Sequence, residues 1–276
     1  MSFAPYAPPE TTRSPMRDWS VTVLGSNGIR LSKGTHFHLD EGPDFAWLSI
    51  YRAAAGGRQI DIVRQRNAEV SVEEGDAVVG WSPCPDNNVR LSVRYRVFAD
   101  QLAVEMRIQA EPLQPYTAYE LFVSSYFNPY LKPRFALRDA SVDPAVGMRW
   151  YETAWCGEFN DEAWPRDDGA RRIFLDGRWM TKPSQNWMLG PDYALPLMTQ
   201  QHRFGPAVIS MARRRDCIGL SGYNSYHNSQ YFHLFGRDAG PGDLLETTVR
   251  IEMVEERQES LDDLAVRRYE DWSDEG

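Results

Sequence analysis

Apolar and polar residues alternate along most of this chain, a pattern typical of β-strands with one buried and one solvated face. The alternation is clearest in residues 244–254, where two rows of side chains point in opposite directions. One row is apolar or β-branched and the other is polar: Leu245, Thr247, Val249, Ile251 and Met253 against Glu246, Thr248, Arg250 and Glu252. A turn rich in Gly and Pro, residues 239–243, precedes this stretch. We therefore predict a half-buried strand here.

Similar patterns predict many further strands separated by short turns. They cover residues 19–24, 29–31, 45–52, 59–63, 68–73, 77–81, 89–97, 102–108, 118–126, 195–200, 207–213, 218–221 and 230–235. Asn27-Gly28 marks the first turn, because Asn-Gly favours the backbone geometry of a hairpin. Facing rows of Arg and Glu in 89–97 and 102–108 are expected to form cross-strand pairs on a solvated outer face, each worth at most ~1 kcal/mol. The rows include Ala103, Glu105 and Arg107.

Residues 118–126 differ from the other strands in the chemistry of their two faces. Alternation groups Tyr119, Leu121, Val123 and Ser125 on one face. The other face carries Glu120, Phe122, Ser124 and Tyr126, and Asn128 if the strand continues. A face that mixes a carboxylate, hydroxyls and rings is unusual for a core, so it is expected to line a groove. Pro129 and Pro133 are expected to end the strand.

The pattern degrades over residues 148–187, which are broken by Gly and Pro and rich in acids. Five tryptophans fall there: Trp150, Trp155, Trp164, Trp179 and Trp187. A long irregular excursion from a regular β pattern is often functional. The alternative is a satellite cluster that caps a sheet edge. The stretch 222–229 also lacks a period and has the polar, aromatic composition of a contact loop.

One helix is predicted, at residues 258–272, from apolar positions spaced i, i+3, i+4 and i+7. Ser260 is its expected N-cap. Residues 1–17 are rich in Pro and are expected to form an irregular arm. The simplest account is an all-β fold: residues 18–276 as a single domain, a large antiparallel β-sandwich with a C-terminal helix.

Composition excludes some classes of partner. The 276-residue chain has a net charge of −9, and its basic tracts are short, as in Arg213-Arg214-Arg215 and Arg267-Arg268. The first of these is expected to be the solvated end of a hairpin. Nucleic acid is therefore not an expected partner. Three scattered cysteines fit a reducing cytoplasm. The N-terminus does not resemble a signal peptide and no window has the ~18 apolar residues of a membrane span, so a cytoplasmic protein without membrane contact is expected. The oligomeric state is left open.

Three segments carry a resemblance to the galactose mutarotase-like superfamily of aldose 1-epimerases and related sugar-binding sandwiches. Residues 240–248 (GPGDLLETT) resemble its late turn and closing strand, and residues 124–128 (SSYFN) resemble its H-x-Y-F-N segment. The run from Gly80-Trp81 through two long strands to Tyr119 resembles the order between its histidine segments. The resemblance implies a β-sandwich and a carbohydrate ligand. Ser124 and Ser125 stand where the family has its catalytic histidine, so this chain is expected to be a divergent member.

Acid/base sugar chemistry needs a base and an acid on opposite sides of the anomeric carbon. His227 is the candidate acid, because imidazole titrates near neutral pH and this one lies in the polar loop; the alternative is a surface loop histidine. Glu152 and Glu158, which flank Trp155, are candidate bases, and Glu120 is a third. Further residues are substrate-contact candidates: Arg64, Tyr126, Asn128, Trp155, Trp187, Tyr226 and His233. His233 is alternatively a satisfied structural residue.

His36 and His38 face the same side of a strand, the spacing that two imidazoles need to reach one metal ion. A divalent metal is the cofactor that this pair would imply; a pair of surface histidines is the alternative. The predicted function is a carbohydrate-active protein that binds a sugar or glycoside in a groove of the sandwich. An acid/base-catalysed epimerase, lyase or hydrolase is favoured. A noncatalytic carbohydrate-binding module and a structural or partner-binding sandwich are the alternatives.

Overall fold

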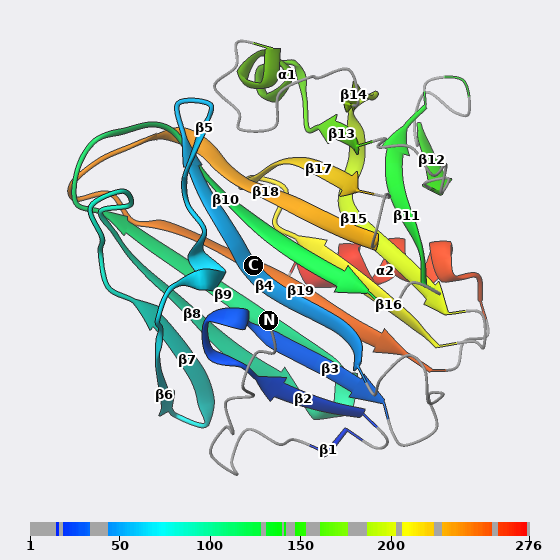
Figure 1. Cartoon of the computed structure of the whole chain (residues 1–276). Coiled ribbons are helices and arrows are strands. Elements are labelled where there is room, and N and C mark those ends of the chain that lie inside the picture. The colour runs from blue at the N-terminus through cyan, green and yellow to red at the C-terminus, as the bar shows by residue number, and fades with distance from the viewer. Residues whose placement is uncertain are drawn as a thin grey trace.

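Two large sheets face each other across a shared core in this computed structural model, which confirms the all-β sandwich (Figure 1). The structure describes residues 15–16, 19–33, 44–127, 131–139, 141, 147–152, 161–175, 187–202, 206–223, 228–255 and 259–274. Nearly all strand pairs are antiparallel, as predicted; β13 and β14 pair in parallel.

The first sheet, called sheet A, has ten strands and lies at the front of Figure 1. Its order is β1 (Pro15–Met16), β2 (Trp19–Val23), β3 (Ile29–Lys33), β4 (Asp44–Ala55), β10 (Tyr116–Phe127), β18 (Asn228–Ala239), β17 (Cys217–Tyr223), β13 (Asp161–Pro165) and β14 (Trp187–Leu189). The tenth strand, β5 (Arg58–Asp61), pairs with the end of β4. The predicted strands at residues 118–126, 218–221 and 230–235 are therefore neighbours at the centre of sheet A.

The second sheet, called sheet B, has nine strands. Its order is β12 (Met148–Glu152), β11 (Leu131–Arg138), β15 (Tyr193–His202), β16 (Ala207–Ala212), β19 (Leu245–Val254), β9 (Ala103–Pro112), β8 (Val89–Phe98), β7 (Asp76–Trp81) and β6 (Glu69–Glu73). Residues 244–254, predicted as a half-buried strand, lie at the centre of this sheet between β9 and β16.

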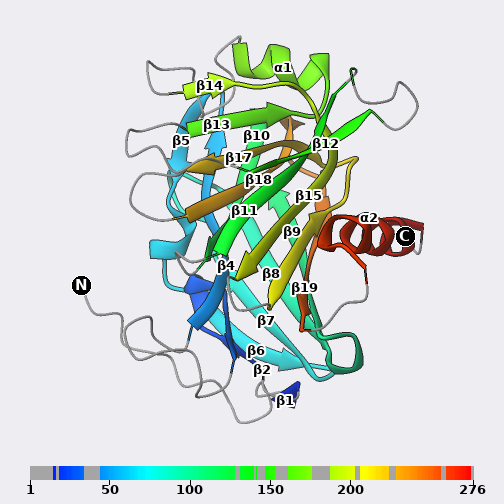
Figure 2. The ribbon, with the colours of Figure 1, turned by 90° about the vertical axis from the view of Figure 1, so that its right-hand side faces the viewer.

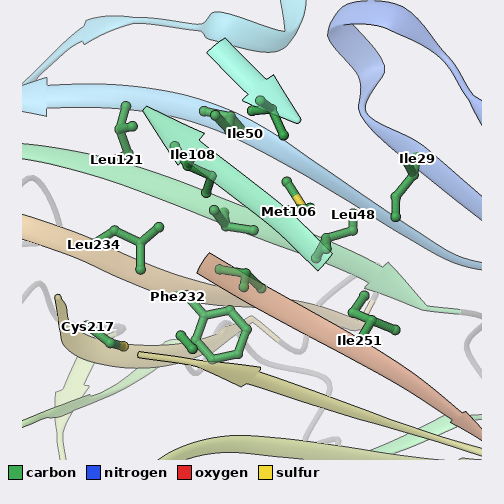
Figure 3. Packing of buried hydrophobic residues seen from close by; sticks show 14 of the residues in the cluster. Ile29, Leu48, Ile50, Met106, Ile108, Leu121, Cys217, Phe232, Leu234 and Ile251 are labelled. Atoms are coloured by element: carbon green, nitrogen blue, oxygen red, sulfur yellow. The ribbon is translucent and has the colours of Figure 1, made fainter. Parts of the chain in front are cut away.

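The core lies between the two sheets and is built from the apolar row of each strand (Figure 3). Sheet A contributes Ile50, Leu121 and Phe232, and sheet B contributes Met106 and Ile251. All five side chains are at most 1% exposed. Burying one such side chain stabilises the fold by roughly 1.5–3 kcal/mol relative to leaving it exposed. The apolar row that alternation predicts in each strand therefore explains why the two sheets pack face to face.

Helix α2 (Leu261–Asp274) covers the outer face of sheet B (Figure 2). It begins three residues after the predicted start and ends two residues after the predicted end. Its apolar stripe includes Leu261, Leu264 and Ala265, which pack on β15 and β16. The backbone N–H of Asp263 donates to Ser260 Oγ over 3.1 Å, so Ser260 is the N-cap, as predicted.

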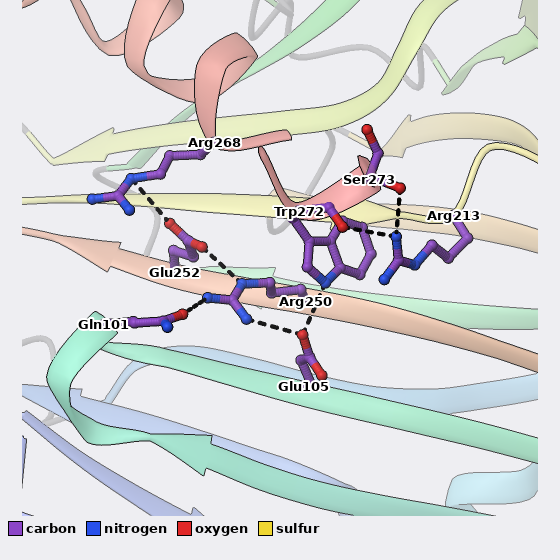
Figure 4. Close-up of polar contacts among 8 residues, drawn as sticks. All are labelled: Gln101, Glu105, Arg213, Arg250, Glu252, Arg268, Trp272 and Ser273. Atoms are coloured by element: carbon purple, nitrogen blue, oxygen red, sulfur yellow. Dashed lines mark hydrogen bonds and ion pairs between the residues drawn. The ribbon is translucent and has the colours of Figure 1, made fainter. Parts of the chain in front are cut away.

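A polar network fastens this helix to sheet B, and Figure 4 shows its members. Arg250 donates from Nε to Glu252 Oε1 (2.7 Å) and from Nη1 to Glu105 Oε1 (2.9 Å). The indole N–H of Trp272 donates to the same Glu105 oxygen over 2.8 Å. Arg213 lies 3.9 Å above the Trp272 ring and donates to its backbone carbonyl over 2.9 Å. The predicted wet face of residues 244–254 is therefore covered near its end, where Arg250 and Glu252 are each 5% exposed.

Among the elements not predicted from the sequence are β1, which lies in the arm expected to be irregular, and β11, β13, β14 and one helix. Strand β11 contains Pro133, which was expected to end a strand; it lies opposite Gln200 of β15 instead. Helix α1 (Asp168–Leu175) follows Asp167, whose Oδ1 accepts the Ala170 N–H over 2.9 Å. A short helix that contains Gly169 gives little periodic signal. Ala103, predicted on the solvated face, is fully buried at the start of β9.

Candidate functional site

The outer face of sheet A carries buried polar side chains at its centre. Leu121 and Val123 of β10 point into the core, so the alternate positions Glu120 and Phe122 point away from it. Phe122 lies opposite His233 of β18. The neighbouring strands β10, β18 and β17 therefore present one row of polar and aromatic side chains. Glu120, Phe122 and Ser124 are at most 1% exposed, so this face does not line an open groove as the sequence had suggested.

Glu120, His233 and Ser221 form a hydrogen-bonded chain across these three strands. His233 Nδ1 lies 2.6 Å from Glu120 Oε1, and His233 Nε2 lies 2.6 Å from Ser221 Oγ. All three side chains are at most 1% exposed. An ionised carboxylate only accepts hydrogen bonds, so with Glu120 ionised Nδ1 carries the hydrogen and Nε2 accepts from the serine hydroxyl.

The surroundings of His233 keep the imidazole neutral. Burial, followed by the positive charge of Arg52, holds the pKa of His233 well below its ordinary value of 6.5. The Phe122 ring lies edge-on to the imidazole, with 4.5 Å between the two ring centres, and helps exclude water. A neutral imidazole between a carboxylate and a hydroxyl can take a proton from that hydroxyl, and the carboxylate then stabilises the imidazolium.

Half-buried aromatic and cationic side chains surround the hydrogen-bonded residues Glu120, His233 and Ser221. The guanidinium of Arg52 lies 4.6 Å from the centre of the Phe122 ring and 4.9 Å from that of Tyr51. Arg64 lies 4.2 Å from the Tyr51 ring centre. Tyr231 stacks on Tyr51 with a separation of 6.1 Å between ring centres. Rings that carry cations on their faces form a surface suited to a neutral polar ligand with exposed C–H groups.

A β-bulge in β4 makes this cluster possible. The register between β4 and β10 shifts between Phe122–Arg52 and Val123–Ile50. Ile50 and Ala53 both belong to the core, so the two consecutive residues between them, Tyr51 and Arg52, lie on the outer side. Bulges commonly re-aim side chains in this way next to functional sites.

The backbone beside the site is strained on both strands. Ala118 has a φ of 46° and Phe235 has a φ of 73°, values that residues with a Cβ rarely adopt. Phe235 is the register partner of Glu120 and lies two residues after His233. Strain of this kind persists only where the surrounding structure imposes it, and it clusters at functional sites.

Two of the residues predicted from the sequence, Glu120 and His233, meet in the structure, and Arg64 lies on the same face. Glu152 does not join them: it is exposed on β12 of sheet B, opposite Arg134. The backbone of Tyr126 pairs with Trp47 and Ser229 in sheet A, and Trp187 begins β14 at the sheet's edge. The other candidates lie outside the described residues: His36, His38, Asn128, Trp155, Glu158, Tyr226 and His227.

The structure adds Ser221, Tyr51 and Arg52 to the candidates. Alternation in residues 218–221 could have identified Ser221, because it shares a face with Gly219 and not with Leu220. Tyr51 and Arg52 could not be assigned to one face, since regular alternation separates neighbours and the bulge is not visible in the sequence.

Neither a metal centre nor a membrane span is found in the part of the chain that the structure describes. No three His, Cys, Asp or Glu side chains gather there in a way that could hold a metal ion. The described helices are also too short or too polar to cross a bilayer.

Comparison with family models and with curated sequences finds no match, whereas comparison of structures finds proteins of similar fold. No protein-family model matches the chain, and no curated protein matches its sequence. A proposed aldose 1-epimerase from Escherichia coli superimposes with a TM-score of 0.53 at 8% identity, covering 87% of this chain and 97% of that one. The GalM/aldose epimerase homologue from Caenorhabditis elegans gives 0.50 at 10% identity, with the same coverage.

A third structure is a larger protein. The α-N-acetylgalactosaminidase NagBb from Bifidobacterium bifidum, in complex with GalNAc, gives a TM-score of 0.58 at 10% identity. The match covers 95% of this chain but 39% of NagBb, so the chain spans well under half the length of that enzyme. Together with the two sheets and their strand order, these matches show that the chain has the galactose mutarotase-like β-sandwich fold.

Proposed function

We propose that this chain binds a sugar or glycoside against the outer face of sheet A and catalyses an acid/base reaction at the anomeric carbon, as an epimerase-type isomerase. The observation that carries the proposal is the buried chain Glu120–His233–Ser221, which is built to hold and move a proton. The names of the structural neighbours, two aldose epimerase-type proteins and a glycosidase bound to GalNAc, support the same class of ligand.

Ser124 strengthens the link to this class of chemistry. It stands where the resembled family has its catalytic histidine, and it is fully buried on the outer face. Its register partner on β18 is Tyr231, and His233 lies two residues further along the same strand and face. The neighbouring strand β18 thus supplies an imidazole that β10 lacks, two residues along the strand from the position opposite Ser124.

Anomeric interconversion then proceeds by ring opening. Ser221 takes the proton of the C1 hydroxyl as it passes its own proton to Nε2 of His233, and Glu120 stabilises the imidazolium that forms. An acid on the opposite side protonates the ring oxygen, and the bond between C1 and that oxygen breaks. His227 is the proposed acid, because the segment that contains it connects β17 to β18. Rotation about the C1–C2 bond and reversal of the transfers give the other anomer and restore both residues.

The half-buried rings and guanidinium groups hold the sugar in this mechanism. Arg52 and Arg64, held against the Tyr51 ring, donate to the hydroxyls of a pyranose, and Tyr231 offers apolar ring surface to its C–H groups. Tyr126, Asn128, Trp155, Trp187 and Tyr226 remain proposed contacts, and Glu158 and Glu152 remain proposed alternative bases.

The test is a thermal-shift screen against mono- and oligosaccharides, uronic acids and glycosides, followed by NMR exchange spectroscopy of any sugar that binds. A ligand at a hundred times its dissociation constant adds about 2.7 kcal/mol of stability, which raises the midpoint clearly. Anomeric exchange above the spontaneous rate should fall by about 100-fold or more in His233→Gln and Ser221→Ala. Arg90→Gln, an exposed change on sheet B, should leave it unchanged. A sugar that binds without faster exchange would contradict the isomerase.

A second function is favoured by one observation. Glu120, Ser221 and His233 are at most 1% exposed and both ring nitrogens are already bonded, so a ligand would meet Tyr51, Arg52 and Tyr231 first. A noncatalytic carbohydrate-binding module would use these contacts alone. For it, Tyr51→Ala should abolish sugar binding, whereas Ser221→Ala should leave the affinity unchanged and no sugar should be turned over.

A further inference from the structure

A cavity with a cationic lining lies on the outer face of sheet B, on the opposite side of the sandwich from the proposed sugar site. Its volume is about 250 Å³. Five arginines line it: Arg94, Arg96, Arg107, Arg213 and Arg215. Two glutamates, Glu105 and Glu246, are the acidic lining residues. A neighbouring cavity of about 330 Å³ shares Arg215 and Glu246 and adds one arginine, Arg237, and one carboxylate, Asp216. The lining thus carries an excess of positive charge in a chain whose net charge is −9.

The pairing of β8 with β9 brings like charges together in this cavity. The predicted facing pairs of opposite charge are present at Arg90–Glu111 and Arg96–Glu105, but between them Arg94 is the direct register partner of Arg107. Like charges directly opposite each other destabilise a sheet. Carboxylates at the edge of the cavity offset this repulsion in part: Glu73 lies 2.6 Å from Arg94, and Glu246 lies 2.9 Å from Arg107.

These carboxylates engage only part of each guanidinium group. Glu246 accepts from Nη2 of Arg107, and Asp76 accepts from Nε of Arg96 and lies 2.9 Å from its Nη2. A guanidinium group has five N–H donors in a planar fork, so each arginine keeps donors beyond these contacts. The side chains of Arg96, Arg107 and Arg215 are 53%, 56% and 74% exposed, which leaves them accessible to a ligand from solvent.

The acidic residue at the boundary of the two cavities is ionised and engaged. A hydrogen bond from Gln109 (2.5 Å), followed by the interaction with Arg107, lowers the pKa of Glu246. Its charge is therefore matched locally by Arg107. Arg215 is likewise paired with Asp216 (3.1 Å) and Arg96 with Asp76 (2.9 Å). The positive potential inside the cavity therefore comes from the excess of arginines over carboxylates in its lining, and a concave surface with such an excess concentrates anions.

We propose that this cavity binds a phosphate dianion, either as free phosphate or as a phosphate monoester. Arginine forks match the geometry of phosphate oxygens and bind them through paired charge-assisted hydrogen bonds. Guanidinium groups from two strands and from the β16–β17 turn surround the volume, so one anion can reach several of them together. Such an anion also relieves the repulsion between Arg94 and Arg107.

The proposal is tested by isothermal titration calorimetry of the whole chain with inorganic phosphate and with glycerol 3-phosphate, at constant ionic strength set by chloride. Saturable one-site binding is expected. Arg107→Gln and Arg96→Gln should each weaken it by about tenfold or more, since each removes charge-assisted hydrogen bonds to the anion. Arg90→Gln is the matched control, because Arg90 is also an exposed arginine of β8 (61%) paired with a glutamate, Glu111, but does not line the cavity. Its affinity should stay within about twofold of the wild type, the scatter expected for a surface change.

The two probes distinguish the sources of the anion. Tighter binding of glycerol 3-phosphate identifies a monoester as the ligand, and equal or tighter binding of inorganic phosphate identifies the free anion. The proposal is overturned if the wild type shows no saturable binding below about 10 mM, an affinity too weak for a built site. Equal losses in Arg107→Gln and Arg90→Gln would also overturn it, because they would indicate general attraction to the surface. Circular dichroism of each variant confirms that the fold is retained.

Discussion

His233 Nδ1 lies 2.6 Å from Glu120 Oε1, and the contact joins residues that are 113 positions apart in the sequence. Both side chains are at most 1% exposed, so neither can replace its partner with water. The pair ties β18 to β10 at the centre of sheet A, on the face turned away from the core. Its loss therefore has consequences for stability that can be separated from those for the proposed catalysis.

Removal of the Glu120 carboxylate should be costly, and an amide in its place should restore part of the stability. Glu120→Ala leaves the His233 N–H without an acceptor and opens a cavity, so we expect a loss of about 2–4 kcal/mol in the free energy of unfolding. Glu120→Gln keeps an oxygen that can accept, and should cost about 1 kcal/mol. Urea denaturation at pH 7.5 measures both. Equal losses would show that the hydrogen bond to His233 does not stabilise the fold.

The stability of the protein should fall on acidification because of His233. Its folded pKa lies well below 6.5, while in the unfolded chain it returns to that value, so below pH 6.5 the unfolded state binds more protons. The contribution is fully present above pH 6.5 and is lost as the pH falls from there toward the folded pKa. The slope reaches at most about 1.4 kcal/mol per pH unit.

The control for this pH dependence is the variant that lacks the imidazole. Unfolding free energies of the wild type and of His233→Gln, measured by urea denaturation between pH 5 and 8, should converge as the pH falls. Groups remote from the site titrate equally in both proteins, so the difference reports His233 together with its partner Glu120. Parallel curves would show that His233 takes up its proton equally well in the folded state.

Gly28 should not tolerate a side chain. Its φ is 75°, and a Cβ at this position would lie 2.0 Å from the backbone oxygen of Leu48. Gly28→Ala should therefore cost about 3 kcal/mol or more, from the left-handed backbone together with a clash against a strand that cannot move freely. Gly56→Ala is the matched control, since its φ is 56° but nothing lies within 4 Å. It should cost only about 1–2 kcal/mol in thermal or urea denaturation.

Trp272 should dominate the attachment of α2. Trp272→Ala removes the ring that packs on sheet B and lies under Arg213, with an expected loss of about 3–5 kcal/mol. Trp272→Phe keeps most of the apolar surface but loses the N–H that binds Glu105, and should cost about 1 kcal/mol or somewhat more. Arg267→Ala, an exposed change on the same helix, should leave the midpoint of denaturant unfolding close to that of the wild type. A Trp272→Ala protein as stable as Arg267→Ala would refute this attachment.

Periodicity identified the strands because alternation reports directly which side of a strand is buried. Periodicity could not indicate which of the polar faces would be covered by another element of the fold. Arg250 and Glu252 have the polar character of a wet face, yet α2 covers them and their charges are matched within the network. The pattern also missed β11, because Pro133 is normally a sign that a strand ends.

The candidate site was only partly visible in the sequence for a related reason. The mixed face of residues 118–126 identified Glu120, and the strand at 230–235 contained His233. Their meeting depends on the order of strands in sheet A, which local patterns do not encode. Alternation could place Ser221 on the outer face, but only the 2.6 Å contact with His233 shows its importance.

The bulge in β4 has a consequence for how this face can change over evolutionary time. Removing Tyr51 would leave Ile50, Arg52 and Ala53 in the regular in–out–in order, so no core residue would change sides. A gain or loss of one codon can therefore add or delete an aromatic contact on a sandwich that is complete without it. The surface proposed to face the ligand and the scaffold beneath it can therefore diverge independently at this position.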